Sequence, residues 1–186
     1  MKSSDELSSP TTGDDLATQD SSPAETEANS TPDAVFAALK HALIQKDWQT
    51  IADCIDQRTA AGIVGFALVP ADLAAKSDPE AKRQLDALFA KYARDQNSSP
   101  TDPIQDPKDR LISSVTDIHE FMVDLMNYLD IYGQASDYSE AFAFDGEFLE
   151  NVEIQGDKAM GILKGETGER TIEFIKVDDS WRIALW

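Results

Sequence analysis

The chain has very little of the chemistry on which most enzymes depend. Its 186 residues include one cysteine and two histidines. A single cysteine excludes an intrachain disulfide and a thiolate cluster for a metal. Cys54 falls in an amphipathic run, where a small buried hydrophobic residue is the expected interpretation. There is no glycine-rich phosphate loop, no paired-histidine motif and no Gly-x-Ser-x-Gly sequence, so we expect no cofactor.

Positive charge is also scarce, because 16 Lys and Arg residues face 35 Asp and Glu residues, for a net charge of −19. This balance argues against binding to nucleic acid or to an anionic membrane surface, and it favours solubility or a basic partner. No apolar run reaches the length of about 18 residues expected for a membrane span. The N-terminus lacks the pattern of a signal peptide. The cellular location stays open between a soluble, cytoplasmic protein and an exported or tethered one, if a signal preceded this chain.

Residues 1–31 differ in composition from the rest of the chain. They contain seven acidic residues, one lysine, no aromatic residue and many Ser, Thr and Pro. Such a segment has too little apolar surface to offset the entropy of ordering, so we expect a disordered acidic tail. The tail is either a tether or an inert extension. Residues 32–186 are predicted to form a single domain.

Apolar residues three and four positions apart predict about five helices within residues 32–132. The first begins at Thr31, where a cap residue is followed by proline and an acid. The nearly all-apolar stretch 60–70 is expected to lie buried between neighbours and to stop at Pro70. We predict the last helix over 111–132, because its apolar stripe alternates steps of four and three.

After residue 146 the apolar period changes from helical to two, which predicts short strands joined by tight turns. The expected strands are 148–155, 158–165, 170–177 and 180–186. Their core faces are predicted to carry Ile172, Phe174, Trp181, Ile183 and Leu185, while Trp186 has the opposite parity. Helices over 32–132 followed by an antiparallel meander over 147–186 predict an α+β fold.

Two segments carry a resemblance to a known family. TPDAVFAALKHALIQKDWQTIADCID and, far downstream, GERTIEFIKVDDSWRIAL resemble the nuclear transport factor 2-like (cystatin-like) superfamily. The resemblance implies a concave sheet lined by helices, which relatives use as a small-molecule pocket, an enzyme or a dimerisation surface. Residues 59–130 depart from the family's usual short pattern, since they are predicted to form three further helices.

Two sets of residues are candidates for chemistry. His119 has acidic neighbours at 117 and 120, and some enzymes of the resembled superfamily use an Asp–His pair, although no motif here matches theirs. The stretch between Arg110 and Lys158 holds eleven acids and no Lys or Arg, which is the ligand chemistry of calcium. Its spacing fits no calcium loop, and a solvated acidic face is the simpler explanation. The candidate metal ligands are Asp137, Glu140, Asp145 and Glu147.

These observations favour a non-enzymatic accessory domain that binds a ligand or a partner. One alternative is an isomerase or hydrolase that uses His119 in a pocket between the long helix and the sheet. Another is a structural homodimer formed through the exposed face of the sheet. A closed apolar interface between helix and sheet would argue against the enzyme, and a deep pocket containing His119 would favour it.

Overall fold

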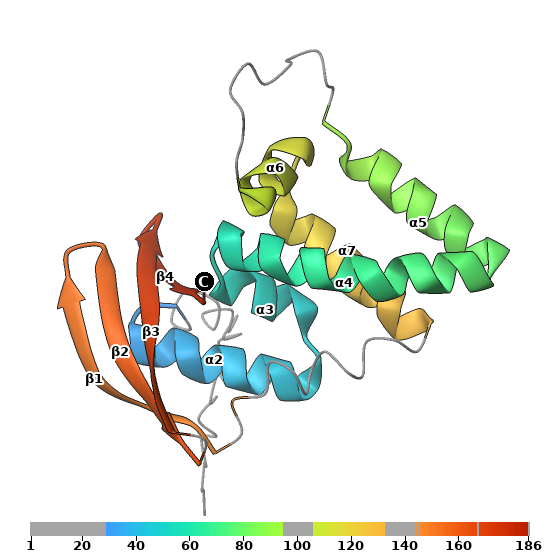
Figure 1. The fold of residues 1–186 in the computed structure, drawn as a ribbon. Coiled ribbons are helices and arrows are strands. Elements are labelled where there is room, and N and C mark those ends of the chain that lie inside the picture. Colours follow the sequence, from blue (N-terminus) through green and yellow to red (C-terminus); the bar gives the residue numbers. More distant parts are fainter. Residues whose placement is uncertain (1–28, 95–105, 133–143, 145, 167, 186) are drawn as a thin grey trace, which may run out of the picture.

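The computed structural model describes residues 29–94, 106–132, 144, 146–166 and 168–185. In this part of the chain six helices precede a four-stranded antiparallel sheet, which confirms the predicted α+β fold (Figure 1). The helices are α2 (Pro32–Gln45), α3 (Trp48–Cys54), α4 (Gln57–Ser77), α5 (Pro79–Tyr92), α6 (Pro107–Ser114) and α7 (Ile118–Ile131). The strands are β1 (Phe148–Gln155), β2 (Lys158–Gly165), β3 (Gly168–Val177) and β4 (Ser180–Ala184).

Each of these six helices begins at a side-chain cap. The caps are Thr31, Asp47, Asp56, Asp78, Asp106 and Asp117, and each accepts a hydrogen bond from a backbone N–H of the first turn. Such caps satisfy donors that have no partner within the helix, and a carboxylate also complements the positive end of the helix dipole. Part of the acidity of the chain therefore serves helix initiation.

The prediction of one helix over 111–132 is wrong, because α6 and α7 are separate helices. Val115 between them is extended and buried, and it forms an isolated antiparallel bridge with Ala93. Asp117 then caps α7 by accepting the backbone N–H groups of His119 and Glu120. A β-branched residue and a cap residue at this point stop one helix and start the next, although the apolar stripe continues across the break.

The prediction for 60–70 is also wrong in two respects. Helix α4 continues through Pro70 to Ser77, although Pro70 has no N–H to donate to the carbonyl of the preceding turn. Burial of Ala67 and Ala71 in the core holds the helix together across this gap. The stretch is not fully buried, because Phe66 is mainly exposed.

Helix α4 is the one helix among the described residues that is long and apolar enough, by length and composition, to cross a membrane. Its 21 residues include an 18-residue window of mean hydropathy 1.3, of which 44% is buried against the rest of the protein. The sequence still contains no uninterrupted apolar run of this length, because the apolar stretch of α4 ends before Asp72. A core helix passes the same test, and α4 packs against α5, α6 and α7.

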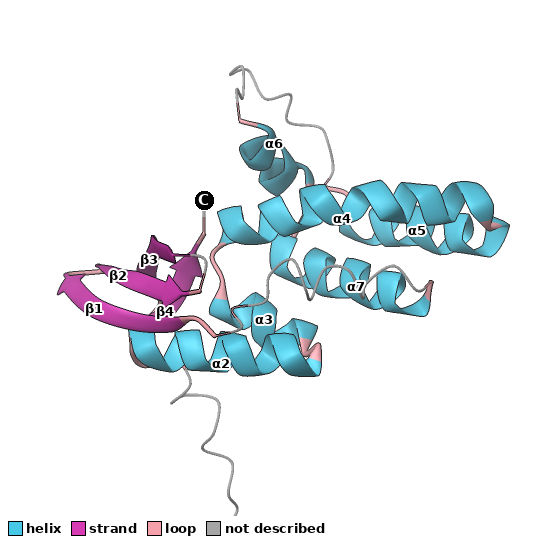
Figure 2. Cartoon of the chain, turned by 60° about the horizontal axis from the view of Figure 1, so that its bottom comes forward, coloured by secondary structure: helices cyan, strands magenta, loops and turns pink. Residues whose placement is uncertain are grey.

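The sheet has the strand order β1-β2-β3-β4, and its register agrees with the predicted faces. Ile172 and Phe174 of β3 and Trp181 and Ile183 of β4 are all buried, and Phe174 pairs directly with Ile183. Helix α2 lies along this face and contacts β4 and β1, as seen in Figures 1 and 2. Figure 2 also shows that α5 and α7 extend away from the sheet.

The free edge of β4 is covered by two segments from the beginning of the domain. Ile55 forms a parallel bridge with Ile183, and the N–H of Trp181 donates to the carbonyl of Asn29 at 2.8 Å. Asn29 also donates from its side chain to the carbonyl of Asp53. Residues 29–31, which the sequence assigned to the tail, thus belong to the domain; residues 1–28 lie outside the described residues.

The turn between β3 and β4 offers a test of the strand register. Asp178 and Asp179 both have positive φ, 49° and 66°, as in the two-residue hairpin turn that favours glycine at its second position. We expect Asp179→Gly to raise the free energy of unfolding by about 0.5–1 kcal/mol in chemical denaturation, because glycine adopts this conformation without steric cost. The substitution also removes the exposed ion pair between Lys176 and Asp179, which should lower the stability by at most a few tenths of a kcal/mol.

The matched control is Asp157→Gly in the turn between β1 and β2. Asp157 does not have a positive φ, so glycine there only adds freedom to the unfolded chain. This variant should be slightly less stable than the original protein. Equal effects of the two substitutions would contradict the assigned turn.

Candidate functional site

His119 is the second residue of α7 and is held in place by hydrogen bonds at both ends. Its backbone N–H donates to the carboxylate of Asp117 at 2.9 Å, and its ring Nε2 lies 3.1 Å from the carbonyl oxygen of Ile55. Because a carbonyl only accepts, Nε2 carries the proton in this contact. Burial lowers the pKa of His119, and the positive charge of Arg182 lowers it further. The imidazole is therefore neutral at pH 7, and Nδ1 is its acceptor.

The partly buried imidazole borders a pocket of about 130 Å³ between the start of α4, the end of α5 and the junction of α6 with α7. Gln57, Arg94 and Thr116 supply its polar groups. Asp117 also borders the pocket, but one of its oxygens already caps α7. Within the described part of the chain no carboxylate is hydrogen-bonded to the imidazole, so the Asp–His pair considered from the sequence is not assembled here.

A small void lies among α2, α3, α4 and α7, beside Leu185, which follows β4. It measures about 20 Å³, enough for about one water molecule, and its lining is apolar. It is lined by Leu39, Leu43, Trp48, Ile51, Ile55, Ile63, Met122, Met126, Phe144 and Leu185. His119 does not border this void. The structure thus separates two features that the sequence analysis joined, a pocket next to the sheet and the histidine.

Cys54 behaves as the buried hydrophobic residue that was predicted. It is almost inaccessible to solvent, and its Sγ lies 3.8 Å from the side-chain oxygen of Asn29. Burial raises the pKa of the Cys54 thiol to about 12, and the nearby Asp53 and Asp47 act in the same direction. The thiol therefore stays protonated at neutral pH, which is unfavourable for a nucleophile.

Of the four candidate metal ligands, Asp137, Glu140 and Asp145 lie outside the described residues. The fourth, Glu147, is paired with Arg170 at 2.7 Å, and its backbone carbonyl accepts a hydrogen bond from Lys40. Glu147 therefore joins the sheet to α2 through groups that a cation would have to displace. No group of three or more His, Cys, Asp or Glu side chains in the described ranges is placed to hold a metal ion.

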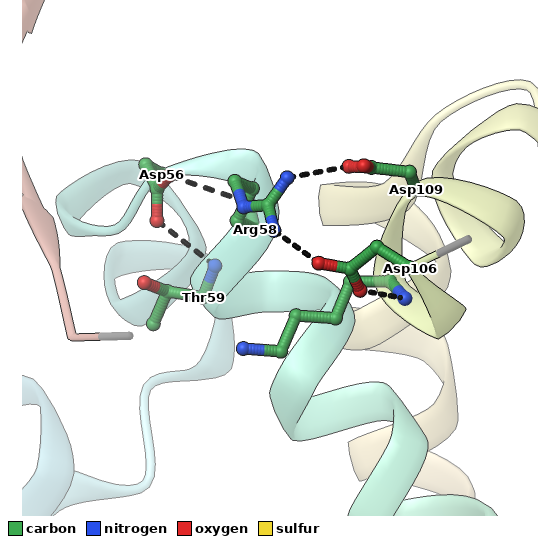
Figure 3. Close-up of polar contacts among 6 residues, drawn as sticks. Asp56, Arg58, Thr59, Asp106 and Asp109 are labelled. Carbon is green, nitrogen blue, oxygen red and sulfur yellow. Dashed lines mark hydrogen bonds and ion pairs between the residues drawn. The ribbon is translucent and has the colours of Figure 1, made fainter. Parts of the chain in front are cut away.

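One polar cluster was not foreseen from the sequence. Arg58, in the first turn of α4, donates from its two terminal nitrogens to Asp109 and Asp106 of α6 at 2.6 and 2.5 Å (Figure 3). Asp56 caps the same turn by accepting the N–H of Thr59 at 2.9 Å. Asp106 also caps α6, so one carboxylate both starts that helix and binds it to α4. We call the contacts of Arg58 with Asp106 and Asp109 the Arg58 clasp.

A second unforeseen feature is an apolar face on α4 that points to solvent. Phe66, Val69 and Leu73 are 61%, 64% and 57% exposed, and their spacing of three and four places them along one side of the helix. We call these three residues the Val69 face. The signal was present in the sequence, because the run AAGIVGFALVP contains more apolar residues than one buried helix face requires.

The arrangement of the described residues thus offers a small polar pocket with a neutral histidine, a salt-bridged clasp beside it, and an exposed apolar face on α4. The histidine and the clasp make contacts between elements of the fold, whereas Val69 and Leu73 of the apolar face lie mainly in solvent. Comparison of the chain with protein-family models, with curated proteins and with solved structures finds no match.

Proposed function

We propose that the chain is a non-catalytic binding domain that docks a protein partner on the Val69 face. The observation that carries this proposal is the exposure of large apolar side chains on one side of α4. The helix buries Ile63 and Val64 together with Ala60, Ala61, Ala67 and Ala71, whereas Phe66, Val69 and Leu73 are mainly exposed. The buried side packs against α5 and α7, and the exposed side is available to a partner.

An exposed row of large apolar side chains is unfavourable in water and promotes aggregation, so such a row often marks an interaction site. Singly exposed apolar residues are common on protein surfaces, but three in succession on one helix face form a contiguous patch. Helical faces of this kind are recognised by partners that insert apolar side chains at matching spacing. The Val69 face is therefore suited to a helix or groove of another protein.

The charge of the chain favours a basic partner over a second copy. Two molecules of net charge −19 repel each other, whereas a partner with Lys and Arg around an apolar contact is attracted and oriented. Asp72, which lies between Val69 and Leu73 in the chain, is already paired with Lys76, so the centre of the face is close to neutral. The attraction then comes from the net negative charge of the chain rather than from the face itself.

The catalytic alternative has weaker support. It needs an acid to orient His119 and a pocket that encloses a substrate, but the imidazole bonds to a backbone carbonyl and its pocket is small. If the resemblance to the nuclear transport factor 2-like superfamily holds, the relatives that serve as interaction surfaces are the better parallel. Homodimerisation remains an outcome that the experiment below distinguishes.

The test uses a photo-crosslinking amino acid at position 69 of the full chain, expressed in the cells where the protein is native. The control carries the same group at Ala87, an exposed residue of α5. We expect a distinct adduct with another protein from position 69. The yield of that adduct from position 87 should be at least tenfold lower. Adding Leu73→Glu should remove the adduct while the free energy of unfolding changes by about 0.5 kcal/mol or less, since Leu73 is mainly exposed.

The dependence of the adduct on salt concentration tests whether the partner is basic. Raising NaCl from about 50 to 500 mM should weaken the adduct at position 69, because screening removes the long-range attraction to a basic partner. An adduct with twice the mass of the chain would show self-association instead. An adduct within one chain, equal adducts at both positions, or no adduct at position 69 would overturn the proposal.

A further inference from the structure

Helix α6 has little stability of its own. It contains eight residues, and none of them is buried. Isolated helices shorter than about 12 residues are marginal in water, so α6 depends on its contacts with the rest of the protein. Leu111 and Ile112 supply the apolar part of these contacts, and both are only partly buried.

The two ends of α6 are held in different ways. At the C-terminal end, the N–H of Arg94 donates to the carbonyl of Ser114 at 3.1 Å, and the N–H of Thr116 donates to the carbonyl of Tyr92 at 3.0 Å. Val115 between them is buried and bridged to Ala93. This junction is pinned by backbone hydrogen bonds and an apolar anchor, which salt does not weaken.

The N-terminal end of α6 is joined to α4 by the Arg58 clasp. Both of its ion pairs are substantially exposed to solvent. Exposed ion pairs shift an equilibrium by only a few-fold each, and dissolved salt reduces that further. The clasp is therefore a weaker attachment of α6 than the junction at residues 114–116.

Helix α6 also forms part of the His119 pocket, so movement of its N-terminal end would change that pocket. Ile112 of α6 forms part of the wall of the pocket that His119 borders, together with groups from α4 and α7. When the N-terminal end of α6 moves away while Val115 stays in place, that wall opens. The groups on the other sides, including Gln57 at the start of α4, keep their positions because they belong to different helices.

We propose that α6 is a strap hinged at residues 114–116, which releases at its N-terminal end when the Arg58 clasp breaks and thereby opens the His119 pocket. The strap is independent of the Val69 face and of the function proposed for it. Because the clasp consists of exposed ion pairs, its release is favoured by salt and by anions that compete for the guanidinium group.

Hydrogen exchange at the backbone amides of α6 tests the release. We expect Arg58→Gln to accelerate exchange at 108–114 by about five- to tenfold in 20 mM NaCl, and Asp109→Asn, which leaves the cap at Asp106, by about two- to threefold. The unchanged protein in 500 mM NaCl should approach the rates of Arg58→Gln. The matched control is Arg83→Gln, which breaks an exposed pair within α5 and should leave α6 unchanged.

Exchange in α7 separates release of the strap from general destabilisation. The amides of 121–129 should exchange at the same rate in all variants and at both salt concentrations. The proposal is wrong if exchange in α7 becomes faster together with exchange in α6. It is also wrong if α6 exchanges no faster than α7 in the unchanged protein, or if Arg58→Gln and Arg83→Gln have equal effects.

Chemical modification of histidine tests whether release opens the pocket. Diethyl pyrocarbonate should modify His119 several-fold faster in Arg58→Gln than in the unchanged protein at 20 mM NaCl. The exposed His41 provides the internal reference, and its rate should not change. If α6 is released but the ratio of the two rates stays constant, the strap does not control access to this pocket and that part of the proposal is wrong.

Discussion

Replacing Trp181 by alanine should lower the free energy of unfolding by about 3–5 kcal/mol, the range for emptying a buried aromatic site. Trp181 is 5% exposed and lies on the face of β4 that packs against the helices, beside Lys176 of β3. Its backbone N–H also fastens Asn29 to the edge of the sheet. Loss of the indole leaves a cavity at the point where the sheet, the first residues of the domain and α2 meet. Chemical denaturation measures the loss.

Trp186 is the sequence-based control for this substitution. It lies outside the described residues, and its parity in the chain is opposite to that of Trp181. We therefore predict that Trp186→Ala costs about 1 kcal/mol or less, as expected for a side chain on the face opposite to the core. Equal losses at the two positions, or a greater loss at Trp186, would contradict the assigned face of the last strand.

Replacing Phe121 by alanine should cost a similar amount, about 3–5 kcal/mol, in the helical part of the domain. Phe121 of α7 is fully buried, and its ring centroid lies 5.6 Å from that of Phe89 and 5.5 Å from that of Tyr92, both on α5. The ring thus fills the space where α7 contacts α5. Its removal leaves a cavity that the backbone of two packed helices cannot readily close.

Phe89 provides a matched control, because it is the same residue type in contact with Phe121 but is 42% exposed. Phe89→Ala should cost about 1 kcal/mol, since much of its ring is already in water and solvent can occupy the space it leaves. A loss at Phe89 as large as that at Phe121 would contradict the arrangement of α5 against α7.

Local patterns in the sequence were sufficient for most of the secondary structure. The cap at Thr31 and the cap at Asp78 each precede a proline in the first turn, and both mark true helix starts. The alternation of Ile172 and Phe174 located the core face of β3 correctly. These signals are reliable because they act within a few residues of the chain, where backbone geometry alone decides which side chains share a face.

The break between α6 and α7 shows where such patterns mislead. The apolar stripe continues from Leu111 through Val115 to Ile118, so periodicity predicts one helix. The extended conformation of Val115 is stabilised by its bridge to Ala93, a partner 22 residues away. The apolar periodicity of a sequence gives no information about a contact between residues so far apart in the chain. Asp117, a residue type that caps helices, is the local evidence against a continuous helix.

The features that bear on function depend most on tertiary structure. The sequence determined that the chain is acidic, that its core is assembled from helices followed by a meander, and that Cys54 and Trp181 are buried. It did not determine that Arg58 meets Asp106, 48 residues away, or that the large residues of the Val69 face point away from the core. Those outcomes depend on which side of α4 its neighbouring helices cover. That choice is made by the packing of the whole domain, since a run that is apolar on every side contains no local information about which side will be buried.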